Sequence, residues 1–172
     1  MKLRFLLVLI SLLVMSCSAQ NGGPLKVGDA APRVSGINEA GQTLSLAEVY
    51  AQQAYTLVYF YPKAGTSGCT AQGCSLRDAY ENLVEKGVAV IGVSSDSVAA
   101  QKAFKDANHF PFPLIADTDR KVQAAFGVPT YPGTRDAQRQ AFLVKNGKIV
   151  WVDYQASTSQ QATDVLQVVA GG

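Results

Sequence analysis

The stretch that decides the fold runs from residue 55 to residue 87 and reads YTLVYFYPKAGTSGCTAQGCSLRDAYENLVEKG. Its first seven residues are apolar, aromatic or β-branched, which is typical of a strand buried on both faces of a sheet. Pro62 ends that run. The apolar residues beyond it return at helical spacing, which predicts an amphipathic helix over residues 68–86 that Gly87 stops. The stretch therefore predicts a strand, a loop and a helix.

The segments on either side extend this alternation of strands and helices. Asn146-Gly147, between two apolar runs, is the strongest short signal for a β-hairpin. Ser45 and Glu48 have the spacing of a capping box, which begins a short helix. We predict an α/β fold with a central mixed sheet flanked by helices, in which the late hairpin runs antiparallel to the buried strands. The elements are an N-terminal hairpin extension (34–37 and 43–46), a second buried strand (88–93), a helix (98–108), a short strand (114–116), a helix (119–126), the late hairpin (140–145 and 148–154) and a closing helix (160–169).

Composition and charge exclude several classes of protein. The 172 residues are 48% hydrophobic and contain no internal repeat, which indicates one ordinary domain over residues 26–172. Apart from Lys2 and Arg4, the chain has 13 basic and 13 acidic residues. It therefore lacks the basic excess that is typical of a nucleic-acid-binding protein. Three Cys and one His are too few for a multi-cysteine zinc module or a haem or iron–sulfur protein, and we expect no cofactor.

The N-terminus has the pattern of an export signal. Lys2 and Arg4 precede the apolar residues 5–15, and this run is shorter than the ~20 residues that a membrane-spanning helix needs. Val14-Met15-Ser16-Cys17 resembles a bacterial lipobox, in which the cysteine is lipidated and becomes the new N-terminus. The sequence therefore predicts a lipoprotein-type signal peptide (1–16), a lipid anchor on Cys17 and a flexible tether (17–25).

Cleavage after Ala19 is the alternative reading of this leader, because small residues also stand at the −3 and −1 positions there. Both readings export the protein. For the lipidated form we expect a location on the periplasmic side of the outer membrane, because Ser18 is not the Asp that commonly retains lipoproteins at the inner membrane.

Cys69 lies where the buried strand gives way to the helix. The unpaired N–H groups and the dipole at the start of a helix favour a negative charge, so they push a thiol toward the nucleophilic thiolate. Cys69 falls on the same helix face as Leu76 and is expected to point inward. Thr66 offers a hydroxyl nearby, and Pro62 offers a rigid apolar wall. Cys74 falls instead on the polar face of the helix, which suggests that the two cysteines have different tasks.

The spacing of these residues resembles a known signature. Pro62, Thr66 and Cys69 stand as Pro-x3-Thr-x2-Cys, the active-site signature of peroxiredoxins, and Cys74 five residues later is similar to the Q (bacterioferritin comigratory protein) subfamily. Ser67 and Ala64-Gly65 depart from the residues usual in that loop. The resemblance covers about residues 26–170 and includes matches at 59–63, 77–78, 92–97, 110–114 and 139–143.

The resemblance implies a thioredoxin-like fold and a thiol-dependent peroxidase activity. The substrates would be hydrogen peroxide and organic hydroperoxides, and a thioredoxin-type donor would regenerate the enzyme. Cys69 would be the peroxidatic cysteine, Cys74 the resolving cysteine and Arg139 the arginine of the pocket, with Thr66 and Pro62 completing the site. We expect the protein to act as a monomer.

Other interpretations stay open at this point. A buried cysteine also occurs as inert packing, and Arg139 at a strand start also occurs as a solvated charge. An exported thiol–disulfide oxidoreductase fits less well, because the cysteines are separated by four residues rather than two. A non-catalytic binding protein on a thioredoxin-like scaffold, or a metal carrier using Cys69, Cys74 and His109, would belong to another class. His109 itself is expected in a surface turn.

The cysteine spacing also has a geometric consequence. Five residues along an α-helix place two α-carbons about 8.7 Å apart on opposite-facing sides. A disulfide tolerates at most ~7 Å between α-carbons. We therefore predict that a Cys69–Cys74 disulfide requires the helix to unwind, which Gly65, Gly68 and Gly73 make easier.

Overall fold

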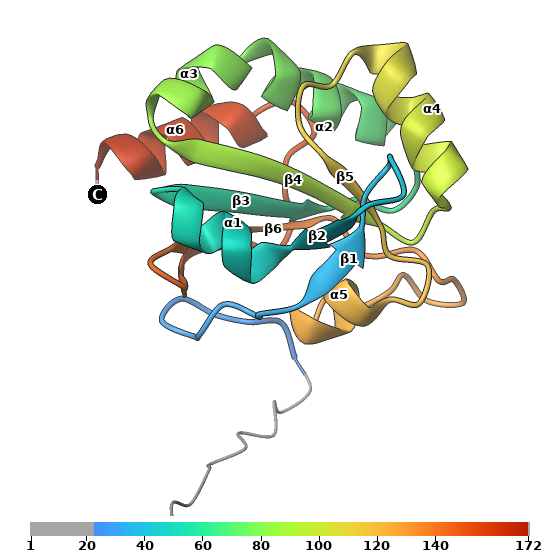
Figure 1. Ribbon diagram of the computed structural model, residues 1–172, viewed down its shortest axis with the longest axis horizontal. Helices are drawn as coiled ribbons and strands as arrows, with labels where there is room; N and C mark the ends of the chain where they lie inside the picture. Colours follow the sequence, from blue (N-terminus) through green and yellow to red (C-terminus); the bar gives the residue numbers. More distant parts are fainter. Residues whose placement is uncertain (1–22, 172) are drawn as a thin grey trace, which may run out of the picture.

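The computed structural model describes residues 23–171 as a layered α/β fold around a five-stranded mixed sheet (Figure 1). The strand order is β5-β4-β3-β6-β7, in which β3, β4 and β5 are parallel and β6 runs antiparallel to β3. Strand β7 is antiparallel to β6 and so runs in the direction of β3, which means that the predicted antiparallel orientation of the late hairpin is correct only for β6. The predicted mixed sheet is confirmed. The bounds are β3 (Tyr55–Phe60), β4 (Val88–Ser94), β5 (Leu114–Ala116), β6 (Gln140–Lys145) and β7 (Lys148–Asp153).

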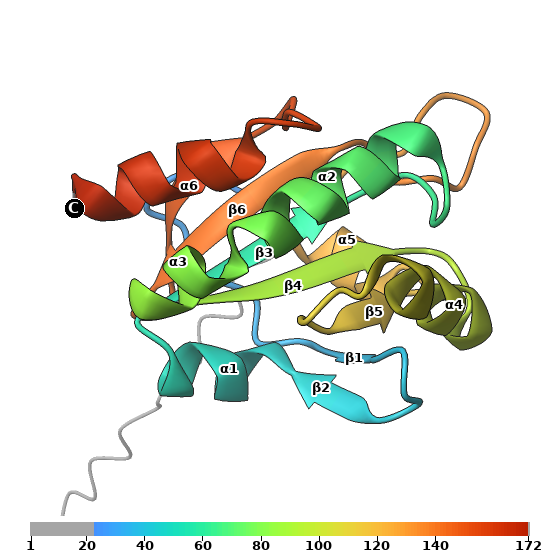
Figure 2. The same cartoon turned by 90° about the horizontal axis from the view of Figure 1, so that it is seen from above.

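Helices cover both faces of this sheet (Figures 1 and 2). We call the "site face" the one covered by α2 (Ser67–Asp78), α3 (Tyr80–Glu85), α4 (Val98–Asn108) and α6 (Gln161–Ala170). We call the "hairpin face" the one covered by α1 (Leu46–Gln52), α5 (Lys121–Ala125) and the predicted hairpin of β1 (Ser35–Ile37) and β2 (Thr43–Ser45).

The central strand β3 supplies both cores. Its side chains alternate between the faces, so Leu57 and Tyr59 enter the cluster of the site face and Val58 and Phe60 enter that of the hairpin face. All four are 0% exposed. This explains why the β3 sequence is a continuous apolar run rather than an alternating one.

Two predicted helices differ from the structure. The helix expected over residues 68–86 is two helices, because Ala79 leaves the helical conformation (φ −99°, ψ 7°). The helix expected over residues 119–126 begins only at Lys121. Asp117 sets that start, since its carboxylate accepts hydrogen bonds from the N–H groups of Val122 (2.9 Å) and Gln123 (2.7 Å). The capping box of α1 is confirmed, with the Ser45 side chain accepting from the Glu48 N–H.

The packed part of the chain includes Leu25. Leu25 is buried and donates its N–H to the Phe126 carbonyl (3.1 Å). Gly127 has φ +66°, and a Cβ there would lie 2.0 Å from the Gly23 carbonyl oxygen, so the chain passes closely over this turn. Leu25, which was expected in the flexible tether, therefore packs against the folded part of the chain. The predicted signal peptide (1–16) and Cys17 lie outside the described residues, within which no helix is long and apolar enough to span a membrane.

Candidate active site

Cys69 is the third residue of α2 and is 1% exposed. Thr66 is the N-cap residue, but its hydroxyl donates to the Lys63 carbonyl (3.0 Å) instead of accepting from the first turn of the helix. The first-turn N–H groups therefore have no side-chain cap, and the positive end of the helix dipole remains available to an anion beside Cys69. The inward orientation predicted for Cys69 is confirmed.

Arg139 reaches Cys69 from a distant part of the sequence. Its Nη2 lies 3.3 Å from the Cys69 Sγ. The pairing of Phe60 with Gln140 explains this contact, since it places Arg139 at the end of β3 where the loop to α2 begins. A guanidinium at that distance stabilises a thiolate by charge and by hydrogen bonding.

Two buried glutamines extend the contact of Arg139 into the protein interior. Arg139 Nη1 donates to the Oε1 of Gln72, and Gln72 Nε2 donates to the Oε1 of Gln161 (2.7 Å). Both glutamine side chains are 0% exposed. The sequence analysis did not identify either residue. A polar residue at position 72, on the inward helix face between Cys69 and Leu76, was the available signal for Gln72.

A second polar network fixes the loop between β3 and α2. The N–H of Ala64 donates to the Asp96 Oδ2 (2.7 Å), which also accepts from the Ser94 hydroxyl (2.7 Å). Gln101 Nε2 donates to that same hydroxyl oxygen (2.8 Å), and the Tyr61 hydroxyl donates to Gln101 Oε1. The loop that carries Thr66 and the half-buried Pro62 is thereby anchored to β4 and α4.

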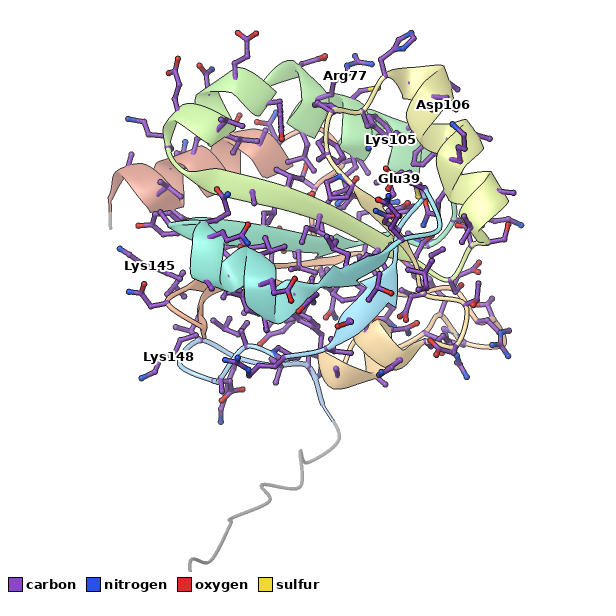
Figure 3. All side chains as sticks on the ribbon, in the orientation of Figure 1. Glu39, Arg77, Lys105, Asp106, Lys145 and Lys148 are labelled. Carbon is purple, nitrogen blue, oxygen red and sulfur yellow. The ribbon has the colours of Figure 1, made fainter. Side chains whose placement is uncertain are left out.

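Cys74 lies on α2 beside the loop that joins α4 to β5. The predicted polar-face position is only partly correct, because Cys74 is half-buried and packs against the apolar cluster of the site face. The Phe110 ring packs closely against neighbouring Gly73, where a Cβ would come within 2.4 Å of it. Arg77, labelled in Figure 3, donates to the Asn108 carbonyl (2.8 Å). Both Cys69 and Cys74 are free thiols.

The comparisons with known proteins agree with this geometry. The AhpC/TSA family model matches residues 27–152. Peroxiredoxin Bcp of Escherichia coli is 39% identical over 152 residues, which cover 83% of this chain and 94% of that protein. The chain belongs to the peroxiredoxins. The family prediction is thereby confirmed, including its Q/Bcp subfamily.

Further relatives place the peroxiredoxin within the same group. The chloroplastic peroxiredoxin Q of rice (japonica) is 37% identical over 131 residues, which cover 76% of this chain but only 59% of the rice protein. The crystal structure of peroxidoxin BcpB from Mycobacterium tuberculosis superposes with a TM-score of 0.80 at 26% identity, covering 86% of this chain and 97% of that one. Bacterioferritin comigratory protein of Xanthomonas campestris gives 0.77 at 23% identity, with 85% and 98% covered. The thioredoxin-like fold is confirmed.

The remaining candidate residues of the peroxiredoxin lie apart from this site. His109 is exposed and ends α4 in the left-handed conformation (φ 53°), so the expected surface turn is confirmed. Among residues 23–171, no three His, Cys, Asp or Glu side chains are placed to hold a metal ion. Cys69, Cys74 and His109 therefore do not form a metal-binding group.

Tyr59 completes the apolar wall of the site. Its ring stacks near Tyr61 at 5.5 Å between centroids, and its buried hydroxyl has no hydrogen-bond partner. Burial, and then the proximity of Tyr61 and Cys69, raises the pKa of Tyr59 well above its ordinary value. Tyr59 therefore stays neutral beside the thiol.

Proposed function

We propose that this chain is a thiol-dependent peroxidase in which Cys69 attacks peroxides. The observation that carries the proposal is the Arg139 guanidinium 3.3 Å from the buried Cys69 sulfur, at the uncapped start of α2. A thiolate and a polarised peroxide both gain from positive charge at this place. The membership in the peroxiredoxins supports the same activity.

The first step is a two-electron oxidation of Cys69. Its thiolate attacks one oxygen of the peroxide, the O–O bond breaks, and an S–O bond forms. The other oxygen leaves as an alkoxide or hydroxide and takes up a proton, so that the products are the Cys69 sulfenic acid and an alcohol or water. Arg139 stabilises the negative charge during this exchange, while Thr66 and Pro62 shape the loop that bounds the site.

The second step joins Cys69 to Cys74. The Cys74 thiol attacks the sulfenic sulfur, a disulfide forms and water leaves. Because the helix holds the two α-carbons about 8.7 Å apart, α2 has to unwind first. The contact of Phe110 with Gly73 lies between the two cysteines, so unwinding has to break it.

The substrates and partners follow from the same chemistry. We propose hydrogen peroxide and organic hydroperoxides as substrates, in line with the alkyl peroxide reduction activity of the Xanthomonas campestris relative. A thioredoxin-type dithiol then returns two electrons to the Cys69–Cys74 disulfide. We propose that the enzyme acts as a monomer, since both cysteines of the cycle lie on one helix.

We further propose that the enzyme is exported and anchored by a lipid on Cys17 at the periplasmic side of the outer membrane. The lipobox-like Val14-Met15-Ser16-Cys17 supports this location. Several acyl chains anchor a protein stably where one is marginal. In cells, Cys17→Ser is expected to move the protein out of the membrane fraction; an unchanged distribution and an unchanged mass would contradict the lipid anchor.

The peroxidase proposal is tested with the reduced chain, one equivalent of hydrogen peroxide and mass spectrometry of the cysteines. The unsubstituted chain is expected to consume peroxide and to form an intramolecular Cys69–Cys74 disulfide. Cys69→Ser is expected to abolish the reaction. Cys74→Ser is the matched control, because it keeps the nucleophile and is expected to stop at the sulfenic acid.

The outcomes separate the alternatives. A Cys69→Ser chain that still consumes peroxide would overturn the role of Cys69, and a disulfide-linked dimer would overturn that of Cys74. A thiol–disulfide oxidoreductase would instead exchange disulfides with a thiol substrate and consume no peroxide. Hydrogen exchange over residues 66–80 measures the unwinding, which is expected to lower protection only in the oxidised chain.

A further inference from the structure

We propose that Gln161, the first residue of α6, is a positioning residue that holds the Arg139 guanidinium against Cys69 by fixing the orientation of the Gln72 amide. Gln161 is 92 positions after Cys69 in the sequence and does not touch it. The inference rests on the proposed function, because Gln161 would act on the reactive Cys69 only indirectly, through Gln72 and Arg139.

The amide oxygen and the amide NH2 group of Gln72 have opposite hydrogen-bonding roles. A guanidinium only donates hydrogen bonds, so Arg139 can bind Gln72 only when the amide oxygen faces it. The amide NH2 group of Gln72 must then face the other way. It meets the Oε1 of Gln161 at 2.7 Å, which accepts its hydrogen bond. In the orientation of Gln72 that suits Arg139, Gln161 thus supplies the acceptor for the Gln72 NH2 group.

Burial makes this acceptor necessary. Gln72 and Gln161 are both 0% exposed, so solvent does not supply another acceptor. A flipped Gln72 would point N–H groups at the N–H groups of Arg139 and repel the guanidinium. Arg139 Nη2 is 3.3 Å from the Cys69 Sγ. Even a small displacement of the guanidinium therefore weakens its electrostatic interaction with the sulfur.

The amide nitrogen of Gln161 supports this role. Its Nε2 is buried and has no hydrogen-bond partner. Such a group lowers stability, so an apolar residue would suit the interior better if packing were its only task. The neighbouring Ala162 and Val165 already bury the start of α6, and the Ser75 hydroxyl donates to the Ser159 carbonyl (3.2 Å). The docking of α6 therefore does not depend on the Gln161 amide.

The experiment compares Gln161→Met, which keeps the length of the side chain and removes the acceptor, with the unsubstituted reduced chain. The first readout is the rate at which Cys69 reacts with hydrogen peroxide. Loss of one buried hydrogen bond in the support of Arg139 is expected to slow this rate about tenfold. Gln161→Glu keeps an acceptor oxygen and is expected to stay within about threefold of the unsubstituted rate.

The second readout is independent of peroxide. Iodoacetate is an anion and iodoacetamide is neutral, so the ratio of their alkylation rates at Cys69 reports the positive charge beside the sulfur. A merely structural effect of Gln161→Met would change both rates together and leave the ratio unaltered. We expect the ratio to fall by a factor of about three, because the guanidinium moves away from the thiolate.

The matched control is Gln123→Met on the hairpin face. Gln123 is 5% exposed and donates one hydrogen bond, to the Val128 carbonyl (3.0 Å). Its substitution is expected to lower the unfolding temperature about as much as Gln161→Met does, with both Cys69 readouts unchanged.

A double-mutant cycle tests the orientation argument itself. In Gln72→Glu, both oxygens accept, so the side chain cannot present a donor to Arg139. In that background Gln161→Met is expected to change the peroxide rate by less than about twofold, which is a non-additive result. Equal effects of Gln161→Met in both backgrounds, or a Gln161→Met chain with the unsubstituted rate and ratio, would overturn the inference. An unsubstituted chain whose Cys69 is inert toward peroxide would instead overturn the proposed function.

Discussion

The two faces of the sheet are built from the same central strand, yet their buried polar groups are used differently. On the hairpin face, the side chains of Asp117 and Gln123 bond to the backbone and fix the ends of α5. On the site face, side chains bond to one another, as in the Gln72–Gln161 and Tyr61–Gln101 pairs. Backbone bonds secure the fold, whereas bonds between side chains orient groups around Cys69. Both faces have a buried apolar core that contributes to stability, and the comparison teaches that the polar side chains that orient groups around Cys69 lie on only one of them.

The largest expected effect tests whether the core of the hairpin face contributes to stability without affecting the reaction of Cys69. Phe60 is 0% exposed and packs on Phe126 (5.3 Å between centroids) and Phe142 (5.9 Å). Phe60→Ala is expected to lower the free energy of unfolding by about 3–5 kcal/mol, because a cavity replaces the ring. Denaturant unfolding measures the loss. The peroxide rate per folded molecule is expected to be unchanged, and a large fall in that rate would break the comparison.

An intermediate effect tests the opposite claim for the site face. Arg139→Ala is expected to slow the reaction of Cys69 with peroxide about 100-fold, because the charge that stabilises the thiolate and the peroxide is lost. Its free energy of unfolding is expected to fall by about 1–2 kcal/mol, less than for Phe60→Ala, because the buried Gln72 oxygen loses its donor. Stopped-flow kinetics and denaturant unfolding give the two values. An unsubstituted rate would remove Arg139 from the site.

The smallest effect concerns a link between the two faces. Glu39, in the β1–β2 loop, accepts from Lys105 Nζ of α4 (2.7 Å) and from the Leu114 N–H (2.9 Å); Figure 3 labels Glu39 and Lys105. Burial alone would raise the pKa of Glu39. The bonds from Lys105 and Leu114 outweigh it and hold the pKa below the ordinary value of 4.5.

The sign of the pH dependence follows. Because the folded pKa of Glu39 is lowered, its contribution to stability is present above pH 4.5 and is lost as the pH falls below that value. Glu39→Gln is expected to destabilise the chain by about 1 kcal/mol at pH 7. Thermal unfolding at several pH values should show this gap closing toward pH 3. A gap that is constant with pH would mean that packing, not charge, makes the link.

Local signals in the sequence predicted most of the fold. The apolar run of β3, the Asn146-Gly147 hairpin turn and the Ser45 capping box each act over a few residues, and each appears in the structure. The break between α2 and α3 at Ala79 was not predicted, because no Gly or Pro stands there in the sequence.

The candidate site divides in the same way. Cys69 and its loop lie within one short motif, and Arg139 was found through its sequence context. Gln161 could not be found, because its contact with Gln72 spans 89 residues and a glutamine at the start of a helix is common on any surface. Residues within a local motif can therefore be predicted from the sequence, whereas residues that reach the site only through the tertiary fold cannot.

The long span of that contact also sets the order in which the site can form. The Cys69–Arg139 contact closes 70 residues of chain, and Gln161 lies still further along it, in α6 (Gln161–Ala170). Contacts that are distant in sequence form late, because the chain must first lose the entropy of closing a long loop. A folding chain therefore has Cys69 without its cation until β6 has paired with β3 and brought Arg139 to the sulfur. The thiol therefore gains its electrostatic support only after these long-range contacts have formed.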